Sequence, residues 1–169
     1  ERNHGAAWNF NRVVHLSRGE YFRWAADDDL CAATLLERCL EVLEAEPEVV
    51  LCASQVEVID GDGEMISPER AAAGGEVLAD SYGPPRTELL ASPRARDRFR
   101  AVLLLSTRCY EEFGLIRMTA LKRTGLHRPY CGAEKVFLAE LSLLGPLRIV
   151  PEVLFFSRWH DDRFSALPT

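Results

Sequence analysis

The sequence predicts an α/β domain, and three observations predict it. Segments with apolar residues at helical spacing alternate with segments rich in valine, isoleucine and aromatic residues, which are typical of strands. The residues are 47% hydrophobic and 27% charged, a balance typical of a folded globular protein and not of a disordered one. With 169 residues, the chain can bury roughly two-thirds of its unfolded surface. Because no linker or repeat divides it, we expect a single domain over residues 1–169.

The beginning of the chain predicts a helix, a strand and a second helix. Residues 6–18 have an apolar face at helical spacing, and Gly19 is the expected C-cap. Residues 20–25 alternate and are rich in aromatic side chains, which favours a strand. Residues 33–46 form the clearest predicted helix, which Pro47 ends. The apolar faces consist of Trp8, Val13 or Val14, and Leu16 in the first helix, and of Leu35, Leu36, Cys39, Leu40 and Leu43 in the second.

A long strand and a tight turn follow. Residues 49–59 are rich in valine, which favours a strand. The Asp-Gly-Asp-Gly stretch at residues 60–63 predicts a turn, with residues 64–66 as a short return strand. Residues 67–93 contain several Pro and Gly residues and predict an exposed loop with one helical turn. A loop of this length in a compact domain is usually functional or mobile.

The second half of the chain predicts three helices with short strands between and after them. The clearest helix covers residues 133–144 and ends at Gly145. Its apolar residues are Val136, Phe137, Leu138, Leu141 and Leu144. The other predicted elements are a helix over residues 94–105, a short strand over 113–117, a short helix over 119–124 closed by Gly125, and one or two strands over 147–159 around Pro151.

Charge and composition exclude several classes of protein. The formal net charge is −6, whereas a general nucleic-acid binder needs a basic surface. No apolar run approaches the ~20 residues of a membrane-spanning helix. The five cysteines are odd in number and form no C-x-x-C pair, so we expect reduced thiols and neither a disulfide framework nor a zinc site. No apolar stretch follows residues 1–4, so we expect no signal peptide and a cytoplasmic location, with the inner face of the membrane as an alternative.

Three adjacent carboxylates, Asp27, Asp28 and Asp29, follow the predicted strand at residues 20–25. Open α/β sheets bind ligands beyond the carboxyl ends of their strands. Hard cations such as Mg²⁺ and Mn²⁺ prefer oxygen ligands and often use one or two carboxylates together with substrate phosphates. The alternative is a solvated loop in which Asp29 caps a helix that starts near Ala32.

The surroundings of this triplet match a longer pattern. Asn3, Gly5 and Asn11 precede a helix, Gly19-Glu20-Tyr21 follows it, and the acidic triplet comes next. This order and spacing resemble the glycosyltransferases of family 2. The resemblance covers nearly the whole chain. Its further segments are Val58-Ile59-Asp60-x-x-Gly63, Phe113-Gly114-Leu115-Ile116-Arg117, the stretch from Gly132 through Glu134 to Gly145, and the stretch from Val150 through Arg158 to His160.

The resemblance implies a partial GT-A domain, which is a Rossmann-like, three-layer α/β/α fold with a mixed sheet. Family members begin with a β-α-β unit that holds the nucleotide base and ribose. By resemblance, Glu1 falls after that unit, so we expect an incomplete domain. A complementing N-terminal segment or a second copy of the chain is the expected partner.

The resemblance also implies a reaction. The family transfers a sugar from a nucleoside-diphosphate-sugar to an acceptor hydroxyl with inversion. A Mg²⁺ or Mn²⁺ ion acts as Lewis acid on the leaving diphosphate, and a carboxylate takes the proton of the acceptor. Glu134 matches the position of the catalytic base. The acceptor is a saccharide, a lipid-linked molecule or a small molecule, and residues 67–93 and 106–131 are expected to select it.

The other site residues carry over in the same way. Asp28, Asp29 and His160 are the expected metal ligands, and Asp28, Arg158, Arg163 and Trp24 are expected to contact the donor. Plainer alternatives stay open. Glu134 is alternatively an ordinary acid at a helix start, and Trp24 a core residue. His160 is alternatively a surface residue, and Arg158 and Arg163 pair with Asp161 and Asp162. We expect Glu111-Glu112 to be a solvated pair.

Two positions depart from the family pattern. Many relatives have an aspartate where this chain has Ala26, and the base is usually an aspartate where this chain has Glu134. A displacement of ~1 Å at a reacting group can slow a reaction ~100-fold. The competing hypothesis is therefore a non-catalytic, truncated or degenerate GT-A-like module that binds a partner. A nucleotidyltransferase is a weaker hypothesis because the sequence has no Gly-rich phosphate loop.

Overall fold

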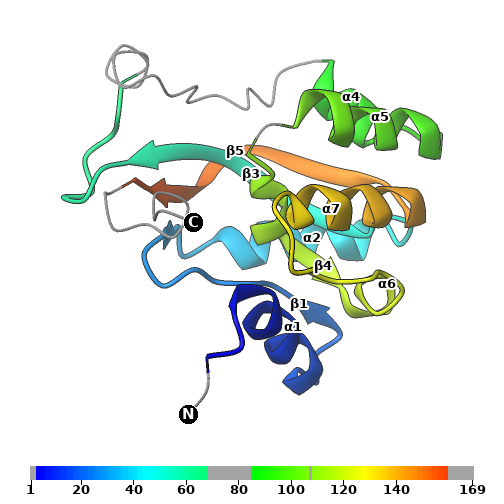
Figure 1. Ribbon diagram of the computed structural model, residues 1–169. Helices are drawn as coiled ribbons and strands as arrows, with labels where there is room; N and C mark the ends of the chain where they lie inside the picture. The colour runs from blue at the N-terminus through cyan, green and yellow to red at the C-terminus, as the bar shows by residue number, and fades with distance from the viewer. Residues whose placement is uncertain (1–2, 68–84, 107, 160–169) are drawn as a thin grey trace.

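The computed structural model describes residues 3–67, 85–106 and 108–159. Within them, a five-stranded mixed sheet has helices on both faces (Figure 1), which confirms the predicted three-layer α/β/α architecture. The strands are β1 (Tyr21–Phe22), β2 (Leu30–Cys31), β3 (Leu51–Ile59), β4 (Leu115–Arg117) and β5 (Leu147–Arg158). The helices are α1 (Ala6–Leu16), α2 (Leu35–Ala45), α4 (Arg86–Leu90), α5 (Ala95–Leu105), α6 (Met118–Leu121) and α7 (Ala133–Leu144), with a 3₁₀ turn, η1 (Tyr110–Phe113).

The two long strands form the centre of the sheet, whose order is β1-β4-β3-β5-β2. β3 and β5 are parallel, and the three shorter strands are antiparallel to their neighbours. Around residues 147–159, where one or two strands were predicted, the structure has a single strand with an irregularity. Ser54 pairs with Val150 and Gln55 with Val153, so Pro151 stays outside the ladder. This placement follows from chemistry, because proline has no N–H to donate.

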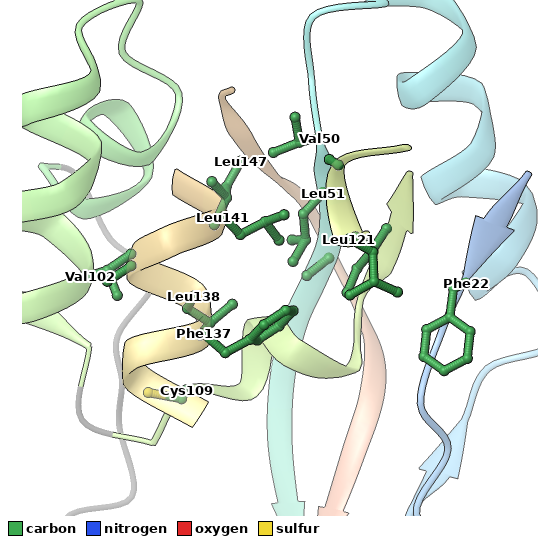
Figure 2. Close-up of a cluster of buried hydrophobic side chains, with 14 of the residues drawn as sticks. Phe22, Val50, Leu51, Val102, Cys109, Leu121, Phe137, Leu138, Leu141 and Leu147 are labelled. Atoms are coloured by element: carbon green, nitrogen blue, oxygen red, sulfur yellow. The ribbon is translucent and has the colours of Figure 1, made fainter. Parts of the chain in front are cut away.

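The sheet separates two clusters of buried side chains. Leu51 and Ala53 of β3 lie in the larger cluster, and Cys52 between them lies in the smaller one, as the two-residue period of a strand requires. Figure 2 shows the larger cluster, in which Phe137, Leu138 and Leu141 of α7 pack toward β3 and β5. The smaller cluster is covered by α2 through Leu35, Cys39 and Leu43. The predicted helices at 33–46, 94–105 and 133–144 and the predicted strand at 49–59 are thereby confirmed within one or two residues.

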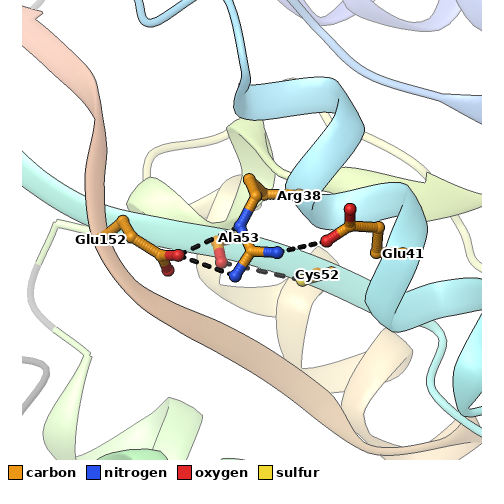
Figure 3. Close-up of polar contacts among 5 residues, drawn as sticks. All are labelled: Arg38, Glu41, Cys52, Ala53 and Glu152. Atoms are coloured by element: carbon orange, nitrogen blue, oxygen red, sulfur yellow. Dashed lines mark hydrogen bonds and ion pairs between the residues drawn. The ribbon is translucent and has the colours of Figure 1, made fainter.

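An exposed ion-pair network ties α2 to the irregular part of β5 (Figure 3). Arg38 donates to the same Glu152 oxygen from Nε at 3.0 Å and from Nη2 at 2.7 Å, and it also pairs with Glu41 one turn along the helix. Arg38 and Glu152 lie two-fifths exposed, so solvent screens the pair. We therefore assign it a role in orienting the strand segment and not in global stability.

The first helix differs from its prediction in length and in the face that it buries. It ends at Leu16, because the Ser17 N–H donates to the carbonyls of Val13 and Val14 and its hydroxyl donates to Val14 O at 2.7 Å. Gly19 is therefore not the C-cap. Val14 is buried, whereas Trp8 and Leu16 are exposed. The ring of Trp8 stacks on His4 at a centroid distance of 4.6 Å. The apolar residues alone did not identify the buried face, because the side of the helix that packs on the core is partly polar.

Other differences have similarly local causes. The strand predicted at residues 20–25 contains only two residues, because its partner β4 is itself short and pairs only with Tyr21 and Phe22. Leu36 and Val136 are exposed. α7 ends at Gly145 as predicted, but with an extended backbone. A Cβ atom there would lie 2.5 Å from Glu48 O, so close packing explains the glycine.

The segment at residues 67–93 contains the predicted helical turn, which is α4. The rest of that predicted loop, residues 68–84, lies outside the described residues. The predicted return strand is present as a single bridge between Ile59 and Met65. In the parts of the chain that the structure describes, no helix has the length and apolarity to cross a membrane.

Candidate functional site

The topology orients the predicted catalytic acid toward the side of the sheet where the acidic triplet lies. α7 leads through Gly145 directly into β5 and runs back over the sheet, so its first turn is at the helix end that points toward the carboxyl end of β5 (Figure 1). Glu134 is in that first turn. The last residue of β5, Arg158, contacts Asp28 and Asp29. We call this side of the sheet the carboxyl-end edge.

Arg158 holds the acidic loop against the turn that follows β3. Its backbone N–H donates to Asp29 Oδ1 at 2.8 Å, and its Nε donates to the Asp28 carbonyl at 2.8 Å. Its Nη1 donates to the carbonyls of Asp60 at 2.9 Å and Gly61 at 2.8 Å. The guanidinium therefore joins the acidic loop to the turn after β3, although Arg158 is 130 residues from Asp28 and 98 residues from Asp60 in the sequence. Because Nε and Nη1 both donate to backbone carbonyls of these loops, the role of Arg158 is to position the two loops relative to each other.

The carboxyl of Asp29 is in an unfavourable place for a negative charge. Burial raises its pKa, and the neighbouring charge of Asp28 raises it further. The Arg158 N–H, a hydrogen bond from Ser157 and the charge of Arg23 oppose this shift. Asp29 does not cap a helix, because β2 comes next and α2 begins only at Leu35. The alternative of a helix cap at Asp29 is therefore wrong.

The acidic loop has a donor set that suits a hard divalent cation. Asp28 and Asp29 offer carboxylate oxygens, and a cation beside them would relieve the repulsion that raises the pKa of Asp29. Within the described ranges, no group of three or more His, Cys, Asp or Glu side chains is arranged around a metal position. Two carboxylates with substrate phosphates are a common arrangement for Mg²⁺, so the residues fit the ion. The predicted ligand His160 and the predicted donor contact Arg163 lie outside the described residues.

Next to Glu134 lies a buried pair that sequence reasoning missed. Glu112 Oε2 and His127 Nε2 are 3.4 Å apart, and neither atom has a hydrogen-bond partner among the described residues. The two residues are 7% and 8% exposed. Glu134 is close enough for its charge to act on both pKa values. The pair therefore belongs to the environment of the predicted base.

Glu112 and His127 are both uncharged near neutral pH. Burial, then the charges of Glu134 and Glu111, raise the pKa of Glu112 to about 8. Burial lowers the pKa of His127, while Glu134 opposes that shift. Glu112 thus keeps a proton that it can share with His127, and the site avoids two ionised carboxylates side by side. The expectation of a solvated Glu111-Glu112 pair is wrong, because η1 turns both side chains inward.

The side chains around this pair are aromatic. Trp24 is 5% exposed and lies edge-on to His127 at 5.2 Å and to Phe137 at 5.3 Å. Asn11 of α1 holds the backbone of His127 through two hydrogen bonds, of 2.9 and 3.0 Å. The structure therefore places Trp24 in the core behind His127, as its plainer alternative describes.

Arg23 connects the two halves of the site and was also missed. Its Nε donates to Phe113 O at 2.8 Å and its Nη2 donates to Cys31 Sγ at 2.9 Å. Phe113 ends η1, which carries Glu112, and Cys31 lies just after the acidic loop. The sequence did not indicate that Arg23 links these segments, because its acceptors, Phe113 O and Cys31 Sγ, are not adjacent to it in the chain.

The raised pKa of Glu112 predicts a specific pH dependence of stability. Its pKa in the folded chain lies above its ordinary value of 4.5, so the folded state binds more protons and loses stability as pH rises toward about 8. Between pH of about 6.5 and about 8, His127 is neutral, so the titration of Glu112 dominates the pH dependence of stability at this pair. We expect the free energy of unfolding of the wild type to fall by about 2 kcal/mol relative to Glu112→Gln over that window, at about 1.4 kcal/mol per pH unit.

Urea unfolding of both proteins at the two pH values measures the difference. The exposed Glu88→Gln is the matched control, and an equal slope in Glu112→Gln and wild type contradicts the assignment.

Comparison with protein families gives a match. The model described as Glycosyl transferase family 2 matches residues 1–125. This range includes the acidic loop, η1 and Glu112, and it ends before α7 and β5. No curated protein matches the chain.

Proposed function

Because this chain belongs to glycosyltransferase family 2, we propose that it moves a sugar from a nucleoside-diphosphate-sugar to an acceptor hydroxyl with inversion of configuration. One observation carries this proposal. Arg158 holds the Asp28-Asp29 loop at the carboxyl end of β5, and Glu134 lies in the first turn of α7, at the helix end that points toward that loop. A charge-stabilising group and a base at one edge are what the reaction needs.

The acidic loop is the proposed donor side. Asp28 and Asp29 hold the cation, with His160 as a further ligand, and Arg163 binds the diphosphate through its planar fork. When bound, Mg²⁺ or Mn²⁺ supplies Lewis-acid stabilisation of the charge on the leaving diphosphate. Arg158 fixes the loop and the turn at Asp60, so the carboxylates need little rearrangement when the donor arrives.

Glu134 is the proposed acceptor-side base. It accepts the proton of the acceptor hydroxyl as the oxygen attacks the sugar carbon from the face opposite the diphosphate. The neutral Glu112 and His127 pair keeps a second negative charge away from it. Trp24 forms the rigid wall behind that pair.

The test is a calorimetric titration of the chain with UDP, GDP and dTDP, with and without Mn²⁺. We expect at least one nucleotide to bind only with the metal, because the diphosphate and the carboxylates need a shared cation. Asp29→Asn removes one carboxylate charge and should weaken this binding at least about tenfold. Asp27→Asn is the matched control, since Asp27 is exposed and adjacent. A thermal melt verifies that Asp29→Asn remains folded.

The alternative function is a non-catalytic module that binds a partner. The departures at Ala26 and Glu134 favour it. Absence of nucleotide binding in every combination, from a chain that melts cooperatively, would contradict the transferase proposal and support this alternative. Binding that is equally strong in Asp29→Asn would remove the acidic loop from the donor site.

A further inference from the structure

A cavity lies at the end of the sheet opposite the carboxyl-end edge. Its volume is about 610 Å³, and it is bounded by the residues just before β3 and β5, by the turn between α4 and α5, and by α6. Val50 and Pro146 mark the amino ends of the two parallel strands. The cavity is therefore separate from the acidic loop and from Glu134. Its charged lining residues are Arg98, Arg117, Arg123, Arg148 and Glu48.

Two of these arginines are fixed in place and have no acidic partner among the described residues. Arg98 is 5% exposed, and it donates from Nε to Ser142 O at 2.6 Å and from Nη1 to Ser92 O at 2.8 Å. Arg117 donates from Nε to Val49 O at 2.8 Å and from Nη2 to the carbonyl of Leu43. No carboxylate of the described residues pairs with Arg98 or Arg117.

The charge of Arg98 is thus desolvated and only partly compensated. Burial lowers its pKa, and no opposing acid acts on it. Ser142 and Leu43 lie in the last turns of α7 and α2, whose helix dipoles supply roughly half a negative charge each. This compensation explains how the two guanidiniums are tolerated. Arg117 uses all three of its nitrogens for hydrogen bonds, since Nη1 also donates to Tyr21 Oη at 3.2 Å. The capacity for an anion therefore lies with Arg98, because a buried cation gains most from a full opposite charge.

The remaining lining adds positive charge. Arg148 pairs with Glu46 at 2.5 Å, Glu48 is exposed at the rim, and Arg123 is exposed. Together the cavity residues and Glu46 carry four guanidiniums and two carboxylates. This excess occurs in a protein whose formal net charge is −6, so it is a local feature and not a general basic surface.

We propose that this cavity binds a phosphate-bearing ligand, with the phosphate near Arg98 and Arg123 and a compact organic group on the apolar part of the lining. Arginine forks match phosphate oxygens, and fixed guanidiniums lose little entropy on binding. The volume suits a small phosphorylated molecule. The apolar lining is formed by Pro47, Val50, Pro93, Ala120, Leu144 and Pro146. The phosphate belongs either to a soluble molecule or to a lipid headgroup.

The test uses pyrophosphate as the soluble probe and vesicles of phosphatidylcholine with phosphatidic acid as the lipid probe. EDTA in the buffer excludes metal-dependent binding at the acidic loop. Calorimetry and vesicle co-sedimentation measure the two arms, with pure phosphatidylcholine vesicles as reference. We expect the chain to bind one of the two probes. Binding of pyrophosphate would indicate a soluble phosphorylated molecule, and binding of phosphatidic acid vesicles would indicate a lipid headgroup.

The matched variants carry the same charge change inside and outside the cavity. Arg123→Glu should weaken binding at least about tenfold, whereas Arg100→Glu, on the exposed side of α5, should change it by less than about twofold. Asp29→Asn should have no effect, because it lies at the other edge of the sheet. Lack of binding in both arms, or equal binding by Arg123→Glu and wild type, would overturn the proposal.

Discussion

Glu134→Gln is expected to lower the rate of sugar transfer by about 10²–10⁴-fold while the affinity for the donor stays within about twofold. The amide has nearly the same shape as the carboxylate but cannot accept the proton of the acceptor hydroxyl, and a positioned base typically contributes a factor of this size. Glu134 lies in the first turn of α7 and not in the acidic loop, so donor binding should be unaffected. Single-turnover transfer, with the donor identified by titration, measures the rate separately from binding.

Glu134→Asp is the matched control for this variant. It keeps the carboxylate and introduces the residue usual in this family position, so we expect it to retain a large part of the rate. A loss as large as that of Glu134→Gln would show that placement, and not proton transfer, limits the reaction. An unchanged rate in Glu134→Gln would contradict the assignment of the base.

Arg86→Met is expected to lower the free energy of unfolding by about 3–5 kcal/mol. Arg86 and Glu111 form a buried ion pair in which the residues are 3% and 0% exposed, and Arg86 Nη2 also donates to Ser106 Oγ at 2.8 Å. Removing the guanidinium breaks its ion pair with the buried carboxyl of Glu111, and breaking a buried ion pair from one side typically costs this much. Urea unfolding at neutral pH measures the change.

Two controls separate this effect from a general loss of charge. Arg96→Met removes an exposed arginine whose contact with Asp97 is 3.4 Å, and we expect a cost below about 0.5 kcal/mol. The double variant Arg86→Met with Glu111→Leu should recover most of the lost stability, because no charge is then left buried. A cost below about 1 kcal/mol for Arg86→Met alone would show that Glu111 finds another partner or water.

Local patterns in the sequence predicted the long elements correctly. The three-to-four residue spacing of Leu35, Cys39 and Leu43 places them on one face of α2, and that face is buried in the structure. The valine-rich stretch of β3 and the glycine-aspartate turn after it are equally local signals. The spacing of Asn3, Gly5, Asn11 and Gly19-Glu20-Tyr21 likewise predicted the family, which the match over residues 1–125 confirms.

The sequence by itself therefore determined the fold class, the family and the position of the acidic loop, because periodicity and motif spacing are properties of neighbouring residues. Only the tertiary structure decided which charged groups are buried together. Glu112 meets His127, Arg86 meets Glu111, and Arg158 meets the loop at Asp28 across large separations in sequence. Adjacent acids such as Glu111 and Glu112 look solvated in a sequence. Their burial, their partners and hence their pKa values depend on how α7, η1 and the preceding segments pack around them.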